Sequence, residues 1–383
     1  MNLNPFLSLN NKCNKLLMSH PHWESPMALN GKFTAVIYSP RYLLHDTGLG
    51  HPESPMRLKA IVKELRKSGL TKRTEIKKIS PRKASIGQIQ SVHSEDYVSL
   101  VRKTSKMRHA ILDTGDTVTS PDSYDVALLA AGGTIQASEL VLSGKFKNAF
   151  ALVRPPGHHA GVDYASGFCI FNNVALAASN LIRNHHLNRI AIIDIDGHHG
   201  NGTQEIFYNT KSVLYVGLHS DPTHFPWTGF IDEVGEGAGV GYNINIPLPS
   251  GTDDDLYQEA LEEVALPVIY QYKPEFILVS AGFDCHYADP ILDLSLTANG
   301  YKKTVQKIVT LAEGTCGGRL VMVLEGGYNL LYLSRMVAAT IAQLAELDYV
   351  IEDTERKADS SVKSVGRRTL KELKEILSPY WEL

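Results

Sequence analysis

Histidines and aspartates cluster in three short segments of the sequence, with a spacing that suits a catalytic metal ion. The segments are IDIDGHHGNG (193–202), RPPGHHA (154–160) and SAGFDCHYADP (280–290). Asp196 and His198 are two residues apart, so in an extended segment both side chains point the same way and can bind one ion. Asp284 would complete three nitrogen and oxygen ligands and leave coordination positions free for chemistry. Zn2+ suits this set best, and Fe2+ or Co2+ would accept the same ligands.

Neighbouring side chains supply the other groups that hydrolysis needs. His158 and His159 are candidates for acid and base chemistry, and a carboxylate such as Asp194 could hold one imidazole in a chosen tautomer. The hydroxyl of Tyr328, which follows two glycines in LEGGYN, could donate to an oxyanion that forms on a carbonyl. Taken singly, such residues are usually helix caps, turn residues or packed core side chains. Their occurrence together indicates metal-assisted hydrolysis of an amide or ester.

Buried strands that alternate with helices must position these residues. Apolar runs of strand length occur at 33–39, 150–153, 190–196, 213–218, 276–280 and 320–325. Helical patterns occur at 54–69, 123–142, 172–184, 253–272 and 297–313. Strands buried on both faces and joined by helices predict an α/β fold with a parallel sheet covered by helices. Because ligands bind at the carboxyl ends of such strands, four of them would bring His, Asp and Tyr side chains to one edge.

Length and composition fit one catalytic domain. A chain of 383 residues, 43% hydrophobic and 21% charged, can bury a sizeable core, and no repeat or flexible linker divides it. We expect an N-terminal extension over 1–30, a catalytic domain over 31–347 and a charged C-terminal tail over 348–383. Within the tail, the segment TLKELKEIL (369–377) is expected to form a short amphipathic helix.

Charge and cysteine content exclude several classes of protein. A net charge of -3 gives no basic surface for nucleic acid, so we expect no direct nucleic-acid binding. The four cysteines form no CxxC pair, which argues against a disulfide framework and a thiolate zinc site. No apolar run is long enough for a membrane span or a secretory signal, so we expect no membrane contact. An intracellular, cytoplasmic protein fits best, with the nucleus or an organelle as alternatives, and the sequence gives no oligomeric state.

Six motifs occur in order along the chain and together carry a family resemblance. They are HPESPMRL (51–58), RPPGHHA (154–160), GFCIFNNVALAA (167–178), IDIDGHHGNGTQEIF (193–207), SAGFDCHYADP (280–290) and LEGGYN (324–329). With them, the region from residue 33 to 345 resembles the histone deacetylase superfamily, which includes zinc-dependent deacetylases, bacterial deacetylase-like amidohydrolases and acetylpolyamine amidohydrolases. The resemblance implies the single-domain arginase-deacetylase fold with a central eight-stranded parallel sheet, one catalytic zinc ion, and hydrolysis of an N-acetylated amine to acetate and free amine.

The resemblance also implies a role for each matching residue. The family's zinc ligands match Asp196, His198 and Asp284. Tyr328 matches the oxyanion-stabilising tyrosine, and His159 is expected to take a proton from the attacking water and later deliver it to the leaving amine. His158, paired with Asp194, is expected to help mainly through its charge. Some members have an aspartate where this chain has Asn201, and the class II branch also has the asparagine. The resemblance therefore implies that His159 is less basic here than in the aspartate-bearing branch.

Substrate and ion preferences follow from further matched positions. The walls of the family's narrow substrate tunnel match Gly167, Phe168 and Phe225. Polyamine-selective class II relatives carry a glutamate where this chain has Ile291, and the segment from His93 to Pro121 is too short for the insertion of bacterial acetylpolyamine enzymes. Acetylated lysine side chains of proteins are therefore favoured as substrate, with acetylated polyamines as the alternative. Structural K+ would bind through Asp194 and main-chain carbonyls, but Gly217 replaces a serine that often contributes a hydroxyl.

Two other functions compete with the deacetylase interpretation. A ureohydrolase of the related arginase fold would need two manganese ions and further aspartates at both metal segments, which the sequence lacks. A catalytically inactive binder of acyl-lysine would have no use for the tandem histidines and Tyr328. Both functions are therefore less favoured than hydrolysis of an acetylated amine.

Overall fold

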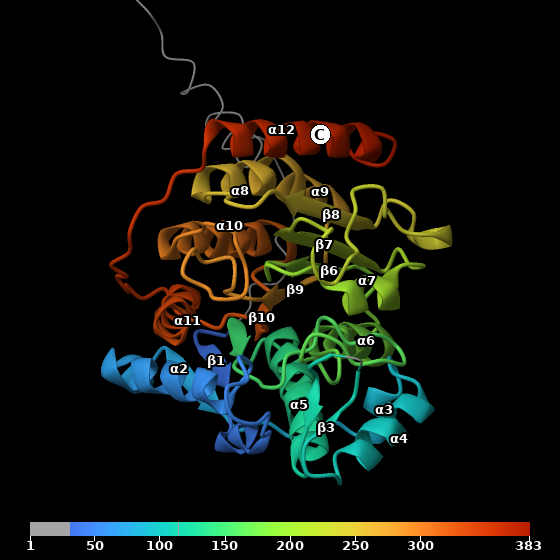
Figure 1. The fold of residues 1–383 in the computed structure, drawn as a ribbon, viewed down its shortest axis with the longest axis vertical. Helices are drawn as coiled ribbons and strands as arrows, with labels where there is room; N and C mark the ends of the chain where they lie inside the picture. The colour runs from blue at the N-terminus through green and yellow to red at the C-terminus, as the bar shows by residue number, and fades with distance from the viewer. Residues whose placement is uncertain (1–30, 114) are drawn as a thin grey trace, which may run out of the picture.

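A computed structural model of the chain describes residues 31–113 and 115–383, and its centre is one parallel sheet (Figure 1). The eight strands lie in the order β2-β1-β5-β10-β9-β6-β7-β8. They are β1 (Thr34–Ile37), β2 (Ile76–Ile79), β5 (Asn148–Ala151), β6 (Ile190–Asp194), β7 (Val213–Ser220), β8 (Asn243–Leu248), β9 (Phe276–Ala281) and β10 (Leu320–Leu324). The α/β class and the eight-stranded parallel sheet are confirmed.

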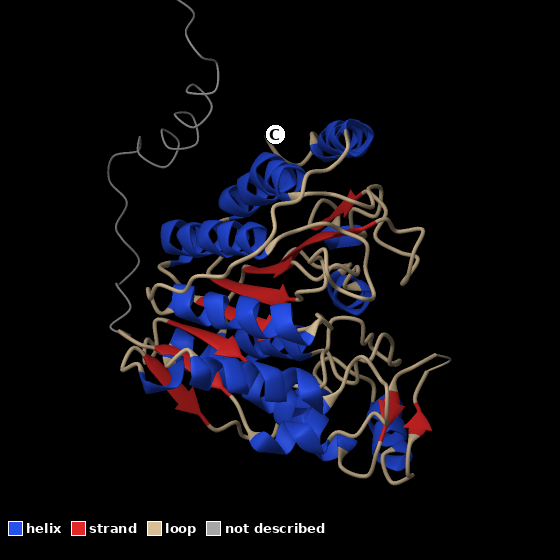
Figure 2. Cartoon of the chain, turned by 60° about the vertical axis from the view of Figure 1, so that its left-hand side comes forward, coloured by secondary structure: helices blue, strands red, loops and turns tan. Residues whose placement is uncertain are grey.

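Helices cover both faces of this sheet, as the side view shows (Figure 2). One face packs against α5 (Ser123–Leu142), α6 (Asn173–His185) and α7 (Asn201–Phe207). The opposite layer contains α2 (Pro55–Lys67), α8 (Asp254–Ala260), α9 (Leu266–Tyr272), α10 (Ala298–Cys316) and α11 (Leu330–Leu344). Two short helices, α3 (Ile86–Ile89) and α4 (Glu95–Thr104), and the hairpin of β3 (Ala110–Ile111) and β4 (Val118–Thr119) complete this part of the fold.

One helix has the length and composition of a membrane span. This is α5, whose apolar window is 72% buried inside the protein. It contacts β1, β5 and β10 of the sheet and the neighbouring helix α6, so its apolar character is explained by its burial in the core.

The two edge strands and the interior of one helix differ from the sequence prediction. The edge strand β2 reads IKKI and exposes both lysines, and the opposite edge strand β8 contains two asparagines and Pro247, so neither has the apolar pattern of a central strand. The helix predicted over 253–272 is divided into α8 and α9 by a π-helical segment, Leu261–Ala265 (η4).

The C-terminal tail forms a longer helix than the short one predicted. Helix α12 (Ser360–Leu377) begins well before residue 369 and packs on α8 and β8, at the top of Figure 1. Leu370, Leu373 and Leu377 are buried, and Gly366 lies against Leu256 of α8. The charged part of the tail is helical because its cations pair with acidic residues of the α8–η4 segment. These pairs are Lys363–Asp255, Arg367–Glu259 and Lys374–Glu263. The predicted extension over 1–30 lies outside the described residues.

Four adjacent strands at the centre of the sheet position the predicted site. Strands β5, β10, β9 and β6 are neighbours, and the chain leaves each of them at the same edge. The loops that follow them begin at Leu152, Glu325, Gly282 and Ile195. RPPGHHA lies in the first loop, and LEGGYN, SAGFDCHYADP and IDIDGHHGNG each begin in the last residues of a strand and continue into the loop. Segments far apart in sequence therefore meet at one place.

Candidate active site

Asp196, His198 and Asp284 lie together at this edge of the sheet, and their side chains could hold a metal ion. One ligand atom from each residue lies within 4.8 Å of the other two. Nδ1 of His198 is 2.8 Å from Oδ2 of Asp284 and 3.3 Å from Oδ1 of Asp196. Both carboxylates are fully buried, and His198 is only slightly exposed. The ligand spacing predicted from the sequence is therefore present in the folded chain.

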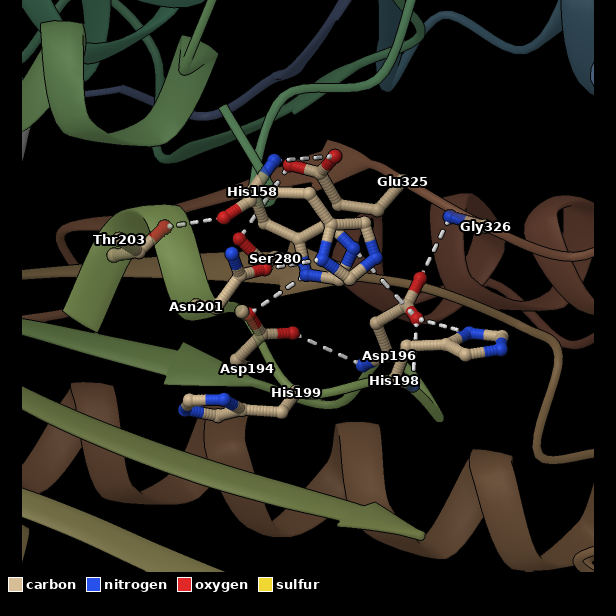
Figure 3. A network of polar contacts seen from close by, with 12 residues as sticks. His158, Asp194, Asp196, His198, His199, Asn201, Thr203, Ser280, Glu325 and Gly326 are labelled. Carbon is tan, nitrogen blue, oxygen red and sulfur yellow. Dashed lines mark hydrogen bonds and ion pairs between the residues drawn. The ribbon is translucent and has the colours of Figure 1, made fainter. Parts of the chain in front are cut away.

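Main-chain amides fix the two carboxylates. The amide of Gly326 donates to Oδ2 of Asp196 at 2.8 Å (Figure 3). The amide of Gly197 donates to Oδ1 of Asp284 at the same distance. A Cβ atom on Gly326 would lie 2.6 Å from Asp196 and 2.7 Å from Asp284. Glycine is required at this position because any side chain would fill the space between the two ligands.

The charge balance of this cluster suits a divalent cation. Burial and the neighbouring Asp196 carboxylate raise the pKa of Asp284, because two negative charges lie side by side away from water. A cation between them would relieve both effects. One imidazole and two carboxylates suit Zn2+ or Fe2+ as ligands. They leave coordination positions free, as in a catalytic metal site, whereas a structural site has all of its positions filled by protein ligands.

The tandem histidines have different partners and different protonation. Nδ1 of His158 lies 3.0 Å from Oδ2 of Asp194, and Nδ1 of His159 lies 2.7 Å from Oδ1 of Asn201. Burial opposes the charge of His158, but Asp196 and Asp194 raise its pKa to about 10. Burial and the nearby cationic His158 hold the pKa of His159 well below its usual range. His159 is thus the neutral imidazole of the pair and can accept a proton.

A cavity of about 530 Å³ lies beside the histidines. Tyr328, Phe168 and Phe225 line it together with His159 and His198. The ring of Phe168 lies 5.9 Å from that of Tyr328, and Phe225 lies 5.1 Å from His159. Burial raises the pKa of Tyr328, so its hydroxyl stays protonated and can donate. Gly167 has φ +51, and a Cβ atom there would lie 2.3 Å from the ring of His159.

The remaining predicted residues take distinct places around the cavity. Ile291 lines it and is 41% exposed, so it lies at the open end. Asp194 and Asn201 lie behind the histidines and reach the cavity only through them. His199, which shares a motif with the ligands, points away and contacts Thr228 and Gln204.

A buried ionic cluster supports the site and was not predicted. Glu53 accepts from Arg57 at 3.2 Å and from Arg154 at 2.7 Å, and all three side chains are almost completely buried. Arg57 also donates to the main-chain oxygens of Glu325 and Gly327. The HPESPMRL and RPPGHHA motifs contain these three residues, so the sequence motifs included them although no role was predicted for them.

Two further acidic residues contact the site, and no role in it was predicted for either. Glu325 accepts from the amide of Gly157 at 2.6 Å and thereby holds the histidine segment against β10. Asp289 accepts from the amide of Tyr328 at 2.7 Å and joins the metal segment to the tyrosine segment. Both residues follow an apolar strand or lie in a turn, where an acidic residue is common without any role in a site. The sequence alone therefore does not distinguish them from ordinary turn residues.

A family model of the histone deacetylase domain matches residues 51–344. The chain belongs to the histone deacetylase family. The "Probable deacetylase" of Archaeoglobus fulgidus is 41% identical over 359 residues, which are 91% of this chain and 99% of that protein. The "Histone deacetylase-like amidohydrolase" of Pseudomonas aeruginosa is 35% identical and matches 85% of this chain and 86% of its own length.

The histone deacetylase fold is also shared with a plant relative. "Histone deacetylase 15" of Arabidopsis thaliana is 40% identical over 318 residues, and the match spans 56% of that longer protein. The crystal structure of the HD domain of HDA15 matches with a TM-score of 0.83 and 36% identity, over 91% of this chain and 95% of that domain. The resemblance predicted from the sequence motifs is therefore confirmed, together with the deacetylase fold.

Proposed function

We propose that the chain hydrolyses N-acetylated amines with one zinc ion, and that acetyl-lysine side chains of proteins are its preferred substrates. One observation carries the proposal: His198 of the metal-ligand cluster, His159 and Tyr328 line the same aromatic-walled cavity. This arrangement provides a metal, a base and an oxyanion donor around one point, which suits attack of water on an amide carbonyl.

The first step of the reaction, attack of water on the acetyl carbonyl, needs a Lewis acid and a base. Zinc held by Asp196, His198 and Asp284 would polarise the acetyl carbonyl and promote ionisation of water. His159 accepts the proton of the attacking water at Nε2, because its Nδ1 is occupied by Asn201. Collapse of the tetrahedral intermediate breaks the C–N bond, and the same nitrogen returns the proton to the departing amine.

Tyr328 and His158 stabilise charge during these steps. The buried hydroxyl of Tyr328 donates to the oxyanion as the carbonyl carbon becomes tetrahedral. The carboxylates of Asp196 and Asp194 favour the charged form of His158, which adds a favourable field without giving up a proton. The acid–base work therefore falls to His159.

The shape of the cavity supports a thin, flexible substrate. Phe168 and Phe225 line it, and the apolar Ile291 lies at its open end, which suits the aliphatic stem of acetyl-lysine. Acetylated polyamines are the second candidate, because the exposed carboxylates of Asp116 and Asp293 also line the cavity and would attract a distal ammonium.

A structural K+ ion near Asp194 is part of the same proposal. Gly217 carries no hydroxyl, and a Cβ atom there would lie only 2.7 Å from the hydroxyl of Tyr215. Tyr215 fills the space beside Gly217 and accepts from the amide of Gly200 at 3.1 Å. Potassium would therefore depend on Asp194 and main-chain carbonyls, and K+-dependent thermal stability would test its binding.

Acetate release from three substrates tests the proposed function. Zinc-loaded protein should hydrolyse acetyl-lysine peptides with a higher kcat/KM than acetylputrescine or acetylspermidine, and Asp284→Asn should abolish both metal retention and acetate release. A strong preference for the polyamines would establish the second candidate instead. Absence of acetate release from all three substrates at full zinc occupancy would contradict the proposal.

A further inference from the structure

A chain of side-chain contacts runs from His159 away from the cavity to the protein surface. Oδ1 of Asn201 lies 2.7 Å from Nδ1 of His159, and Nδ2 of Asn201 lies 3.2 Å from the hydroxyl oxygen of Tyr164. Glu205, an exposed carboxylate on α7, interacts with the hydroxyl of Tyr164 and raises its pKa. The chain therefore contains an imidazole, an amide, a phenol and a carboxylate, in that order.

The carboxylate end of this chain determines the direction of every hydrogen bond in it. Ionised Glu205 offers only acceptors, so the proton of the Tyr164 hydroxyl points toward it. The Tyr164 oxygen is then left as an acceptor for Asn201, which must present its NH2 group. The amide oxygen of Asn201 consequently faces His159, whose Nδ1 must carry a proton. Nε2 is left with the free lone pair that a base requires.

An asparagine needs such a constraint, whereas an aspartate does not. The two ends of an amide differ only in donor and acceptor character, so a flipped Asn201 would fit the same space and favour the opposite tautomer of His159. An aspartate presents acceptors in both orientations. The contacts of Asn201 beyond His159 therefore matter for the chemistry in this chain.

Local packing holds Tyr164 in the required place. A Cβ atom on Gly161 would lie 2.2 Å from the Tyr164 ring, so the absence of a side chain at this position lets the ring lie against the backbone. The amide of Gly161 donates to the main-chain oxygen of Tyr164 at 3.1 Å. The amide of Val162 donates to Glu205 at 3.2 Å, which ties the same loop to α7. Burial and the interaction with Glu205 raise the pKa of Tyr164, so the phenol keeps its proton.

We propose that Tyr164 and Glu205 are positioning residues that hold the amide of Asn201 with its oxygen toward His159 and thereby fix the tautomer of this imidazole. The proposal rests on the proposed function for the role of His159 as base. The hydrogen-bond chain itself is a separate claim, because the tautomer of His159 can be observed without any substrate.

Kinetics of single and double variants test the effect on the reaction. Tyr164→Phe and Glu205→Gln should each lower kcat by about three- to tenfold, the order of one net hydrogen bond, with KM within about twofold of the wild type. In an Asn201→Asp background, Tyr164→Phe should change kcat by less than about twofold, because an aspartate cannot be flipped into a donor. Tyr270→Phe, on α9 outside the site, is the matched control and should retain wild-type kcat.

Nitrogen-15 NMR of the histidine side chains tests the tautomer directly. The His159 signal, identified by its loss in His159→Gln, should show protonated Nδ1 in the wild type and a mixture of tautomers in Tyr164→Phe. Unchanged kcat and an unchanged tautomer in Tyr164→Phe would overturn the proposal, as would an equal loss of kcat in the Asn201→Asp background. If the wild type hydrolyses no acetylated amine but the tautomer changes as expected, the proposed function fails and the positioning role stands.

Discussion

The guanidinium carbon of Arg57 lies 5.1 Å from the centre of the Tyr328 ring. The same side chain donates to the main-chain oxygens of Glu325 and Gly327, on either side of Gly326. Arg57 thus contacts both the ring and the backbone of the segment that carries the oxyanion donor. Helix α2, which is far from LEGGYN in the sequence, therefore helps to hold the segment that carries Tyr328.

Replacement of Arg57 should damage both stability and turnover. Arg57→Met removes the donors to the tyrosine segment and leaves buried Glu53 with Arg154 as its main cationic partner. Breaking a buried ion pair costs about 3–5 kcal/mol, so we expect a loss of that order in the free energy of unfolding. Urea denaturation and kcat would be measured beside Lys63→Met, an exposed change on the same helix. Equal stability of the two variants would show that the cluster does not support the site.

Tyr328→Phe should separate metal binding from catalysis. Loss of the hydroxyl removes the donor to the oxyanion, and we expect kcat to fall about a hundredfold or more. The metal ligands do not include Tyr328, so the zinc content of the purified variant should equal that of the wild type. Turnover equal to the wild type would refute the oxyanion role of this residue.

Buried His93 should make the fold sensitive to acid. Its Nδ1 donates to the carbonyl of Gly161 and its Nε2 accepts from the amide of Asn172, and burial lowers its pKa from 6.5 to about 4. As pH falls from 6.5 to 4, the unfolded chain binds this proton before the folded chain does. The free energy of unfolding should therefore fall by up to about 3 kcal/mol from this residue alone.

The variant His93→Gln isolates that contribution. Its free energy of unfolding should depend less steeply on pH between 6.5 and 4 than that of the wild type, whatever its stability at neutral pH. Parallel pH profiles for wild type and His93→Gln would contradict the assignment.

A charge at Ile291 should change the substrate preference. This side chain lies at the open end of the cavity, where Ile291→Glu would meet the distal ammonium of an acetylated polyamine. We expect kcat/KM for acetylspermidine to rise about fivefold relative to an acetyl-lysine peptide, the order of one exposed ion pair. Ile291→Gln has a similar shape without the charge and should leave the ratio unchanged. The same ratio in both variants would exclude an electrostatic effect.

The C-terminal helix should contribute to stability in spite of its charged sequence. Leu373 of α12 is fully buried, and Leu373→Ala should cost about 2–5 kcal/mol of unfolding free energy. Lys371→Ala, on the exposed face of the same helix, serves as control and should change stability by less than about 0.5 kcal/mol. A loosely attached tail would give no difference between the two variants.

The central strands and the ligand spacing could be predicted because their signals are local. β6 and β9 are continuous apolar runs, and Asp196 and His198 follow β6 directly. The edge strand β8 is different, because an edge tolerates Pro247 and polar residues that a central strand excludes. The apolar runs therefore predicted the central strands of the sheet and did not predict the edge strands.

The supporting residues could not be predicted in the same way, because their contacts are between distant segments. Nothing near Glu53 in the sequence shows that Arg154 will reach it, and nothing near Asp289 shows that it will accept from Tyr328. The length of helix α12 was underestimated for a similar reason. Its cations have partners only when α8 lies beside it. Such residues become recognisable only in three dimensions.

The position of β10 has a consequence for how the protein is made. This strand lies between β5 and β9, although it is the last in sequence of the eight strands of the sheet. Until Leu320–Leu324 leaves the ribosome, β5 and β9 each expose an unpaired edge, and the tyrosine segment has no place to dock. Insertion of a late strand into the middle of a sheet involves contacts between distant residues and is expected to be slow. We therefore expect catalytic competence to appear only after β10 has been synthesised and inserted, so that a nascent chain without this strand cannot act on acetylated substrates.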